Sequence, residues 1–149
     1  MLEYIHMDFI FDTKLLASVA EQYQLDFVIL HGSYATGRPR PDSDVDIAIV
    51  RKQPLSFDDS AKLYGALAGI FGDTAARELD LKSLYGVDPF LRHEVVRGGR
   101  LLYGDRSAYE DYKAATGRMF EDARPLFELE RALIKKYQRH LNKLIAAYA

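Results

Sequence analysis

Residues 28–50 read VILHGSYATGRPRPDSDVDIAIV, and this stretch decides the fold. The apolar run over residues 25–31 ends at a glycine, which predicts a short buried strand. Proline and glycine punctuate residues 37–41 and predict a loop. Residues 44–50 alternate polar and apolar side chains, which predicts a second strand. The stretch is therefore expected to fold as strand, turn, loop and strand.

The sequence on either side continues this alternation of elements. Its periodicity predicts helices over 11–23, 58–71 and 89–97, strands over 77–84 and 100–103, and a helix from 107 to the end that is broken before Pro125. This order predicts an α/β (α+β) fold, a mixed sheet flanked by helices with a C-terminal helical tail. We expect one domain over residues 1–105 and an extension over 106–149 that packs on this domain or on a partner.

The composition excludes several classes of protein. The chain has 149 residues, of which 48% are hydrophobic and 28% charged, as in a globular domain rather than a disordered chain. The absence of cysteine excludes disulfides, zinc–thiolate sites and cysteine nucleophiles. A net charge of −2 argues against a general nucleic-acid binder. We see no membrane span and no signal peptide, and we expect the cytoplasm.

Three acidic side chains are expected on one face of the sheet. Asp44 and Asp46 are two residues apart on a strand, so both point to the same side, and Asp80 repeats the pattern on the strand 77–84. Carboxylates held together resist ionisation, and hard divalent cations remove that penalty. The three residues therefore predict a site for two Mg²⁺ or Mn²⁺ ions that assists an in-line phosphoryl displacement, with Asp80 also suited to act as the general base.

A phosphate-binding turn is expected just upstream of these carboxylates. Gly32 and Ser33 lie where a strand ends and a short helical turn begins, so free backbone N–H groups there could point at an anion. The Ser33 hydroxyl could donate another hydrogen bond, and Arg38 and Arg40 could add positive charge from the loop. We interpret His31 as a partly buried residue at the strand end rather than as a phosphate contact.

The spacing Gly-Ser, ten residues, Asp-x-Asp resembles the signature of the minimal nucleotidyltransferases of the DNA polymerase β superfamily. LDLK at 79–82 is similar to the strand that bears the third carboxylate of that family, and RGGRLLYG at 97–104 is similar to the segment that closes its domain. The resemblance covers residues 10–105. It implies a polymerase-β-like mixed sheet, two Mg²⁺ ions and ATP as the donor.

The resemblance also assigns roles to individual residues. It implies triphosphate contacts for Gly32 and Ser33, and metal ligation and catalysis for Asp44, Asp46 and Asp80. The chain departs from the family pattern in two places. His31 replaces an aromatic residue, and Thr36 stands where an arginine is common, so that Arg38 would have to hold the phosphate in its place.

The small size of the chain is similar to that of the MntA antitoxins, which are paired with HEPN (HepT) ribonuclease toxins. That resemblance implies transfer of AMP from ATP to a tyrosine of the toxin, within a hetero-oligomer. Two alternatives stay open: a nucleotidyltransferase acting on a small molecule such as an aminoglycoside, and a non-catalytic antitoxin that neutralises its partner by binding.

The C-terminal tail carries an apolar stripe that steps by three or four residues from Leu126 to Tyr148. Residues 124–149 contain six Lys or Arg and two acidic residues, a local charge of +4. We favour a helix packed on its own domain over a helix that binds a partner or dimerises. Contact with nucleic acid is the least favoured role and would use the basic side chains Lys135, Lys136, Arg139 and Lys143.

Overall fold

The computed structural model describes residues 2–6 and 9–148, with side chains from residue 9 onward. Its centre is a four-stranded mixed sheet in the order β5-β4-β3-β6. β3 (Phe27–His31) pairs antiparallel with both β4 (Val45–Val50) and β6 (Arg100–Tyr103), whereas β4 pairs parallel with β5 (Leu79–Ser83). These strands confirm the predicted mixed sheet.

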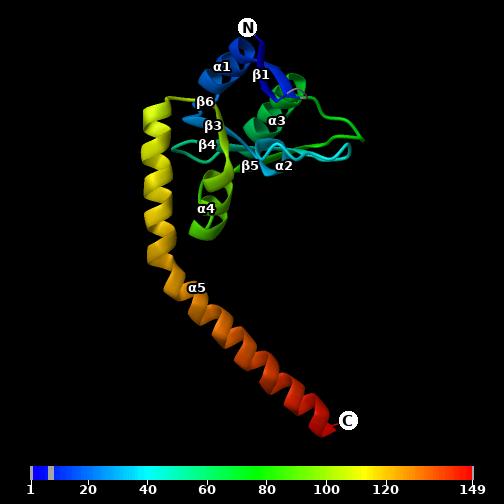
Figure 1. Ribbon diagram of the computed structural model, residues 1–149, viewed down its shortest axis with the longest axis vertical. Coiled ribbons are helices and arrows are strands. Elements are labelled where there is room, and N and C mark those ends of the chain that lie inside the picture. The colour runs from blue at the N-terminus through cyan, green and yellow to red at the C-terminus, as the bar shows by residue number, and fades with distance from the viewer. Residues whose placement is uncertain (1, 7–8, 149) are drawn as a thin grey trace.

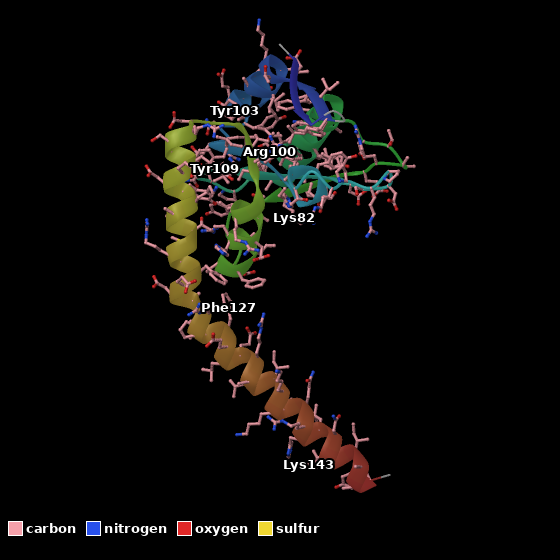
Figure 2. All side chains as sticks on the ribbon, in the orientation of Figure 1. Lys82, Arg100, Tyr103, Tyr109, Phe127 and Lys143 are labelled. Atoms are coloured by element: carbon pink, nitrogen blue, oxygen red, sulfur yellow. The ribbon has the colours of Figure 1, made fainter. Side chains whose placement is uncertain are left out.

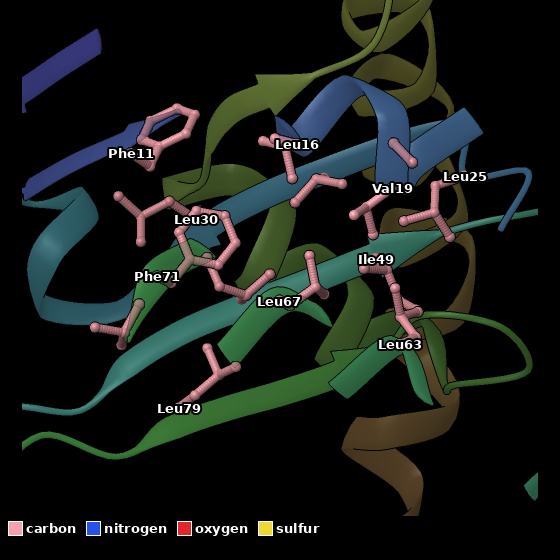
Figure 3. Packing of buried hydrophobic residues seen from close by; sticks show 14 of the residues in the cluster. Phe11, Leu16, Val19, Leu25, Leu30, Ile49, Leu63, Leu67, Phe71 and Leu79 are labelled. Atoms are coloured by element: carbon pink, nitrogen blue, oxygen red, sulfur yellow. The ribbon is translucent and has the colours of Figure 1, made fainter. Parts of the chain in front are cut away.

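Helices cover both faces of the sheet (Figure 1). α1 (Thr13–Gln22) and α3 (Phe57–Phe71) pack on one face, where Leu30, Ile47 and Leu67 belong to the larger core cluster shown in Figure 3. α4 (Pro89–Gly98) and the start of α5 (Arg106–Tyr148) pack on the other face, over a smaller cluster that contains Ile29 and Ala48. Because strand residues alternate between faces, the two clusters take alternate positions of the same strands.

Side chains cap the N-terminal ends of α3, α4 and α1. Ser56 accepts a hydrogen bond from the Asp59 N–H, and its hydroxyl donates to the Asp59 carboxylate, as in a capping box. Asp88 caps α4 immediately before Pro89. Asp12 caps α1 by accepting from the N–H groups of residues 14 and 15.

An N-terminal hairpin was not predicted from the sequence. β1 (Leu2–His6) pairs antiparallel with β2 (Phe9–Asp12), so α1 begins at Thr13 rather than at residue 11. The rings of Phe9 and Phe11 are buried against Phe71, at centroid distances of 5.7 and 5.6 Å. The hairpin thereby covers the end of α3.

The predicted break before Pro125 is wrong. α5 is one helix from Arg106 to Tyr148 with Pro125 inside it, and Figure 1 shows it bending in its middle part. Proline removes one backbone hydrogen bond and crowds the preceding turn, which kinks a helix without ending it when helix-forming residues continue on both sides. Among the described residues, no helix is long and apolar enough to cross a membrane.

α4 and the first half of α5 pack together through aromatic rings. The Phe120 ring stacks on His93 at 4.3 Å, and Phe90 contacts both Phe120 and Phe127 at about 6 Å. Tyr109 is buried near the start of α5. From Leu126 onward, every described side chain of α5 is exposed except Phe127, which is half-buried.

Candidate nucleotidyltransfer site

The sheet register brings a histidine and two carboxylates into one row. His31 of β3 lies opposite Asp46 of β4, and Asp46 lies opposite Asp80 of β5. All three stand on the face of the sheet that carries α4, because they share the strand parity of Ile29 and Ala48. The row therefore forms at one end of three neighbouring strands.

The three predicted carboxylates come together at this end of the sheet. Asp46 lies directly opposite Asp80, and their carboxyl groups interact. Asp44 directly precedes β4, and its Oδ1 accepts a hydrogen bond from the Glu78 N–H at 3.3 Å. Burial raises the pKa of Asp46, and the negative charges of Asp80 and Asp44 raise it further, while Lys82 opposes them. The negative charge of these three carboxylates is therefore only partly balanced.

Lys82 supplies part of the balancing positive charge, and its role was missed in the sequence. Its Nζ lies 2.5 Å from Oδ2 of Asp80. Figure 2 shows Lys82 on the same side of the sheet as α4. The sequence signal is the Asp-x-Lys spacing of residues 80 and 82, which places both side chains on one face of a strand.

The carboxylate oxygens are donors of the kind that Mg²⁺ and Mn²⁺ prefer. Within the described part of the chain, no group of three acidic or histidine side chains is already arranged around a common metal position. The chemistry of Asp44, Asp46 and Asp80 thus fits a divalent cation. Because Lys82 pairs with Asp80, a cation at this site would compete with Lys82 for that carboxylate.

Gly32 brings the backbone against the same carboxylates. It begins the short helix α2 (Gly32–Ala35) with a φ of +69°, a conformation that glycine adopts most readily. A Cβ at this position would lie 2.2 Å from Oδ2 of Asp46. Only glycine therefore allows this close approach between the turn and the carboxylate.

The α2 turn packs against the core through one buried aromatic side chain, and no side chain caps its N-terminal end. Its buried Tyr34 packs on the Phe9 ring at 5.7 Å. His31, which precedes the helix, provides no side-chain cap for the N–H groups of the first turn. The Arg38 N–H donates to the Ser33 carbonyl at 3.0 Å, so the loop turns back over α2, and the Arg38 side chain is exposed. Ser33 directly follows Gly32 in α2, and Arg38 lies on the loop that follows this helix. Their role as phosphate contacts stays a prediction.

His31 is neutral at pH 7. Burial is the main cause that lowers its pKa, to about 4, and the nearby Lys82 adds to this effect while Asp80 opposes it. Its Nε2 is buried, and none of the described residues forms a hydrogen bond with it. A neutral ring cannot attract phosphate by charge, which agrees with its interpretation as a strand-end residue.

A second interaction that the sequence did not indicate fixes the start of β5. The Asp73 carboxylate accepts hydrogen bonds from the Tyr64 hydroxyl at 2.7 Å and from the Leu79 N–H at 3.1 Å. The Tyr64 hydroxyl also lies 3.2 Å from the Leu79 carbonyl oxygen. These bonds tie α3 to the residue immediately before Asp80, so they help to set the position of that carboxylate.

Comparison with known proteins identifies the family. The profile of the family described as "Polymerase beta, Nucleotidyltransferase" matches residues 14–108, and the chain belongs to this family. The match contains the four strands of the central sheet, the α2 turn and all three carboxylates. The curated proteins compared with the chain gave no match.

Solved toxin–antitoxin structures share this fold. The chain resembles a "toxin-antitoxin with AMP-PNP" with a TM-score of 0.64 and 23% identity, over 85% of this chain and 98% of the other. It also resembles a chain of the tri-AMPylated Shewanella oneidensis HEPN toxin in complex with MNT antitoxin, with a TM-score of 0.59, 22% identity and coverage of 85% and 95%. A third similar structure is the toxin–antitoxin MntA-HepT, with a TM-score of 0.58, 21% identity and coverage of 85% and 96%.

Proposed function

We propose that this protein is an MntA-like antitoxin that transfers AMP from ATP to a tyrosine of a HEPN-family toxin. The observation that carries the transferase part is the close approach of the Gly32 turn to the carboxylate of Asp46, which lies opposite Asp80 in the sheet. It places a turn whose first backbone N–H groups have no side-chain cap beside a cluster of carboxylates. The similarity to structures of toxin–antitoxin complexes supports the choice of acceptor.

In this proposal the chain's own residues bind the nucleotide and take up the proton. The N–H groups of Gly32 and Ser33, with the Arg38 side chain, hold the triphosphate. Asp44, Asp46 and Asp80 would hold divalent cations, which would neutralise charge on the phosphates when bound. The tyrosine oxygen attacks the α-phosphorus, the bond to the β-phosphate oxygen breaks, and pyrophosphate leaves. Asp80 accepts the phenolic proton.

The experiment incubates the protein with its HEPN toxin, ATP and Mg²⁺, and measures the intact mass of the toxin. We expect the toxin to gain the mass of AMP, with the site on a tyrosine. The variant Asp46→Asn/Asp80→Asn keeps the shape of both side chains but removes their charge, and it should lose the transfer. Asp42→Asn, an exposed residue of the neighbouring loop, is the matched control and should transfer normally.

Other outcomes separate the alternative functions. If the Asp46→Asn/Asp80→Asn variant still protects cells from the toxin and the toxin stays unmodified, the protein neutralises by binding alone. If ATP is consumed with aminoglycosides and the toxin stays unmodified, the acceptor is a small molecule. Transfer by the double variant at the rate of the natural protein would contradict the assignment of the site.

A further inference from the structure

The second half of α5 exposes an apolar surface that no other part of the described chain covers. Figure 2 shows this half of the helix projecting away from the sheet domain, with Lys143 near its end. Its larger apolar side chains have exposed fractions between 40% and 90%. We call them the distal stripe: Leu126, Leu129, Leu133, Ile134, Tyr137, Leu141, Leu144, Ile145 and Tyr148.

A helix with such an exposed apolar face is only marginally stable on its own. Residues 128–148 extend for about 30 Å beyond the aromatic contacts of Phe127 with α4. Most of the stability of a protein helix comes from packing its apolar face, and a large exposed apolar patch marks an interaction site. The distal stripe is therefore expected to be covered in the working protein.

The charges along this half of the helix are separated by sign. Residues 121–130 contain four acidic side chains and one arginine, a net charge of −3. Residues 131–148 contain five basic side chains and no acidic one, a net charge of +5. The acidic residues are Glu121, Asp122, Glu128 and Glu130, and the basic ones are Arg131, Lys135, Lys136, Arg139 and Lys143.

We propose that the distal stripe binds the same stripe of a second copy of this chain in an antiparallel pair that crosses near Leu133. In this arrangement the acidic residues 121–130 of each helix lie along residues 136–145 of the other, which carry Lys136, Arg139 and Lys143. Glu130 and Lys136 are each three residues from Leu133, so Glu130 of one copy meets Lys136 of the other. A parallel pair would instead place like charges side by side, which is unfavourable.

The spacing of the stripe suits two nearly straight helices. Its central line steps from residue 126 through 129, 133, 137, 141 and 144 to 148, which is 22 residues in six steps. The mean step of about 3.67 residues matches an 11-residue repeat, which stays close to the natural period of an α-helix. An apolar face with this period remains in contact over its full length without strong supercoiling.

The first test is the oligomeric state of the full chain, measured by sedimentation equilibrium in the absence of toxin. We expect twice the mass of the chain, and a loss of the dimer in Leu133→Asp while circular dichroism still shows a folded domain. A monomer at every concentration, with the distal stripe covered only after toxin is added, would overturn the proposal and assign the stripe to the toxin.

The second test reverses charges in sets. One variant carries E121K, D122K, E128K and E130K, and the other carries K135E, K136E, R139E and K143E. Each variant alone should be monomeric, and their equimolar mixture should recover the dimer. D42K and K52E reverse exposed charges of the main domain and are matched controls that should stay dimeric. A mixture that stays monomeric, or a single set that still dimerises, contradicts an antiparallel pair.

The third test uses the natural absence of cysteine to determine orientation. A mixture of Leu126→Cys and Leu141→Cys should form a disulfide between the two variants under oxidising conditions, whereas Leu144→Cys alone should not crosslink. Efficient crosslinking of Leu144→Cys with itself would show a parallel pair and refute the proposal. None of these tests depends on AMP transfer, so their outcome is independent of the proposed function.

Discussion

The end of the sheet around Asp46 and the second half of α5 are two surfaces built in opposite ways. The first is assembled from β3, β4, β5 and the α2 turn, and its groups are held by strand register, burial and close contact. The second comes from one helix, and its apolar groups are exposed to solvent. The first region is suited to catalysis, which needs fixed distances between groups. The second region is suited to binding another chain.

Truncation of a leucine in the core of the sheet domain and of one in the second half of α5 should show the largest difference. Leu67 is fully buried between the sheet and α3, so Leu67→Ala should lower the free energy of unfolding by about 3 kcal/mol. Leu133 has 55% of its side chain exposed, so Leu133→Ala should change the stability of the monomer by less than about 0.5 kcal/mol. Urea unfolding at a concentration where the chain is monomeric measures both values. Equal losses would mean that α5 packs on the domain in solution.

A methyl group at Gly32 tests the tight packing of the site. Gly32→Ala places its Cβ 2.2 Å from the Asp46 carboxylate at a φ of +69°, and should lower the free energy of unfolding by about 2 kcal/mol. Gly65 lies in α3 with no atom within 4 Å of its added Cβ. Gly65→Ala is therefore the matched control, and should stabilise the protein by about 0.5–1 kcal/mol. Thermal unfolding compares the two, and a Gly32→Ala variant as stable as the natural protein would contradict the close approach.

The Gly32 turn also shows how much of the site could be predicted from the sequence. The Gly-Ser and Asp-x-Asp spacing indicated a turn beside carboxylates, since strand alternation decides which side chains share a face. Three features escaped that reasoning. The pairing of residues 2–6 with 9–12 depends on the tertiary contacts of Phe9 and Phe11. The position of Lys82 depends on the negative charge around Asp80. The continuity of α5 through Pro125 depends on the helical turns that precede and follow this proline.

Removal of the Lys82 ammonium tests the exchange between lysine and metal. Lys82→Met should leave the negative charges of Asp46 and Asp80 without their cation and cost about 1 kcal/mol or less, because the pair is partly exposed. Mg²⁺ should then raise the melting temperature of the variant more than that of the natural protein, since the ion no longer competes with Lys82. Lys62→Met, which breaks an exposed pair with Asp58, is the matched control. A smaller Mg²⁺ effect in Lys82→Met would show that Lys82 assists metal binding.

The neutral His31 predicts a weak dependence of stability on pH. Its pKa of about 4 in the folded chain lies below the usual 6.5, so the unfolded chain binds the proton more readily between these values. This contribution to stability is complete above about pH 6.5 and is lost as the pH falls towards 4. The half-buried ring is screened by solvent, so the loss should be about 1 kcal/mol.

His31→Phe isolates this effect from other titrating groups. The raised pKa of Asp46 acts in the opposite sense, because stability from a raised carboxyl pKa is lost as the pH rises, and Asp46 is present in both proteins. Urea unfolding without metal, compared between pH 7 and pH 5, should show a smaller loss in His31→Phe than in the natural protein. The same loss in both would mean that His31 is accessible to protons in the folded state.

The most direct test of the account is whether the three carboxylates bind a divalent ion together with the nucleotide. Paramagnetic resonance of Mn²⁺ in the presence of ATP reports bound metal without requiring a toxin or turnover. We expect the natural protein and Asp42→Asn to bind Mn²⁺ with ATP, and Asp46→Asn/Asp80→Asn to lose that binding. Unchanged Mn²⁺ binding in the double variant would place the metal and nucleotide elsewhere and contradict the site described above.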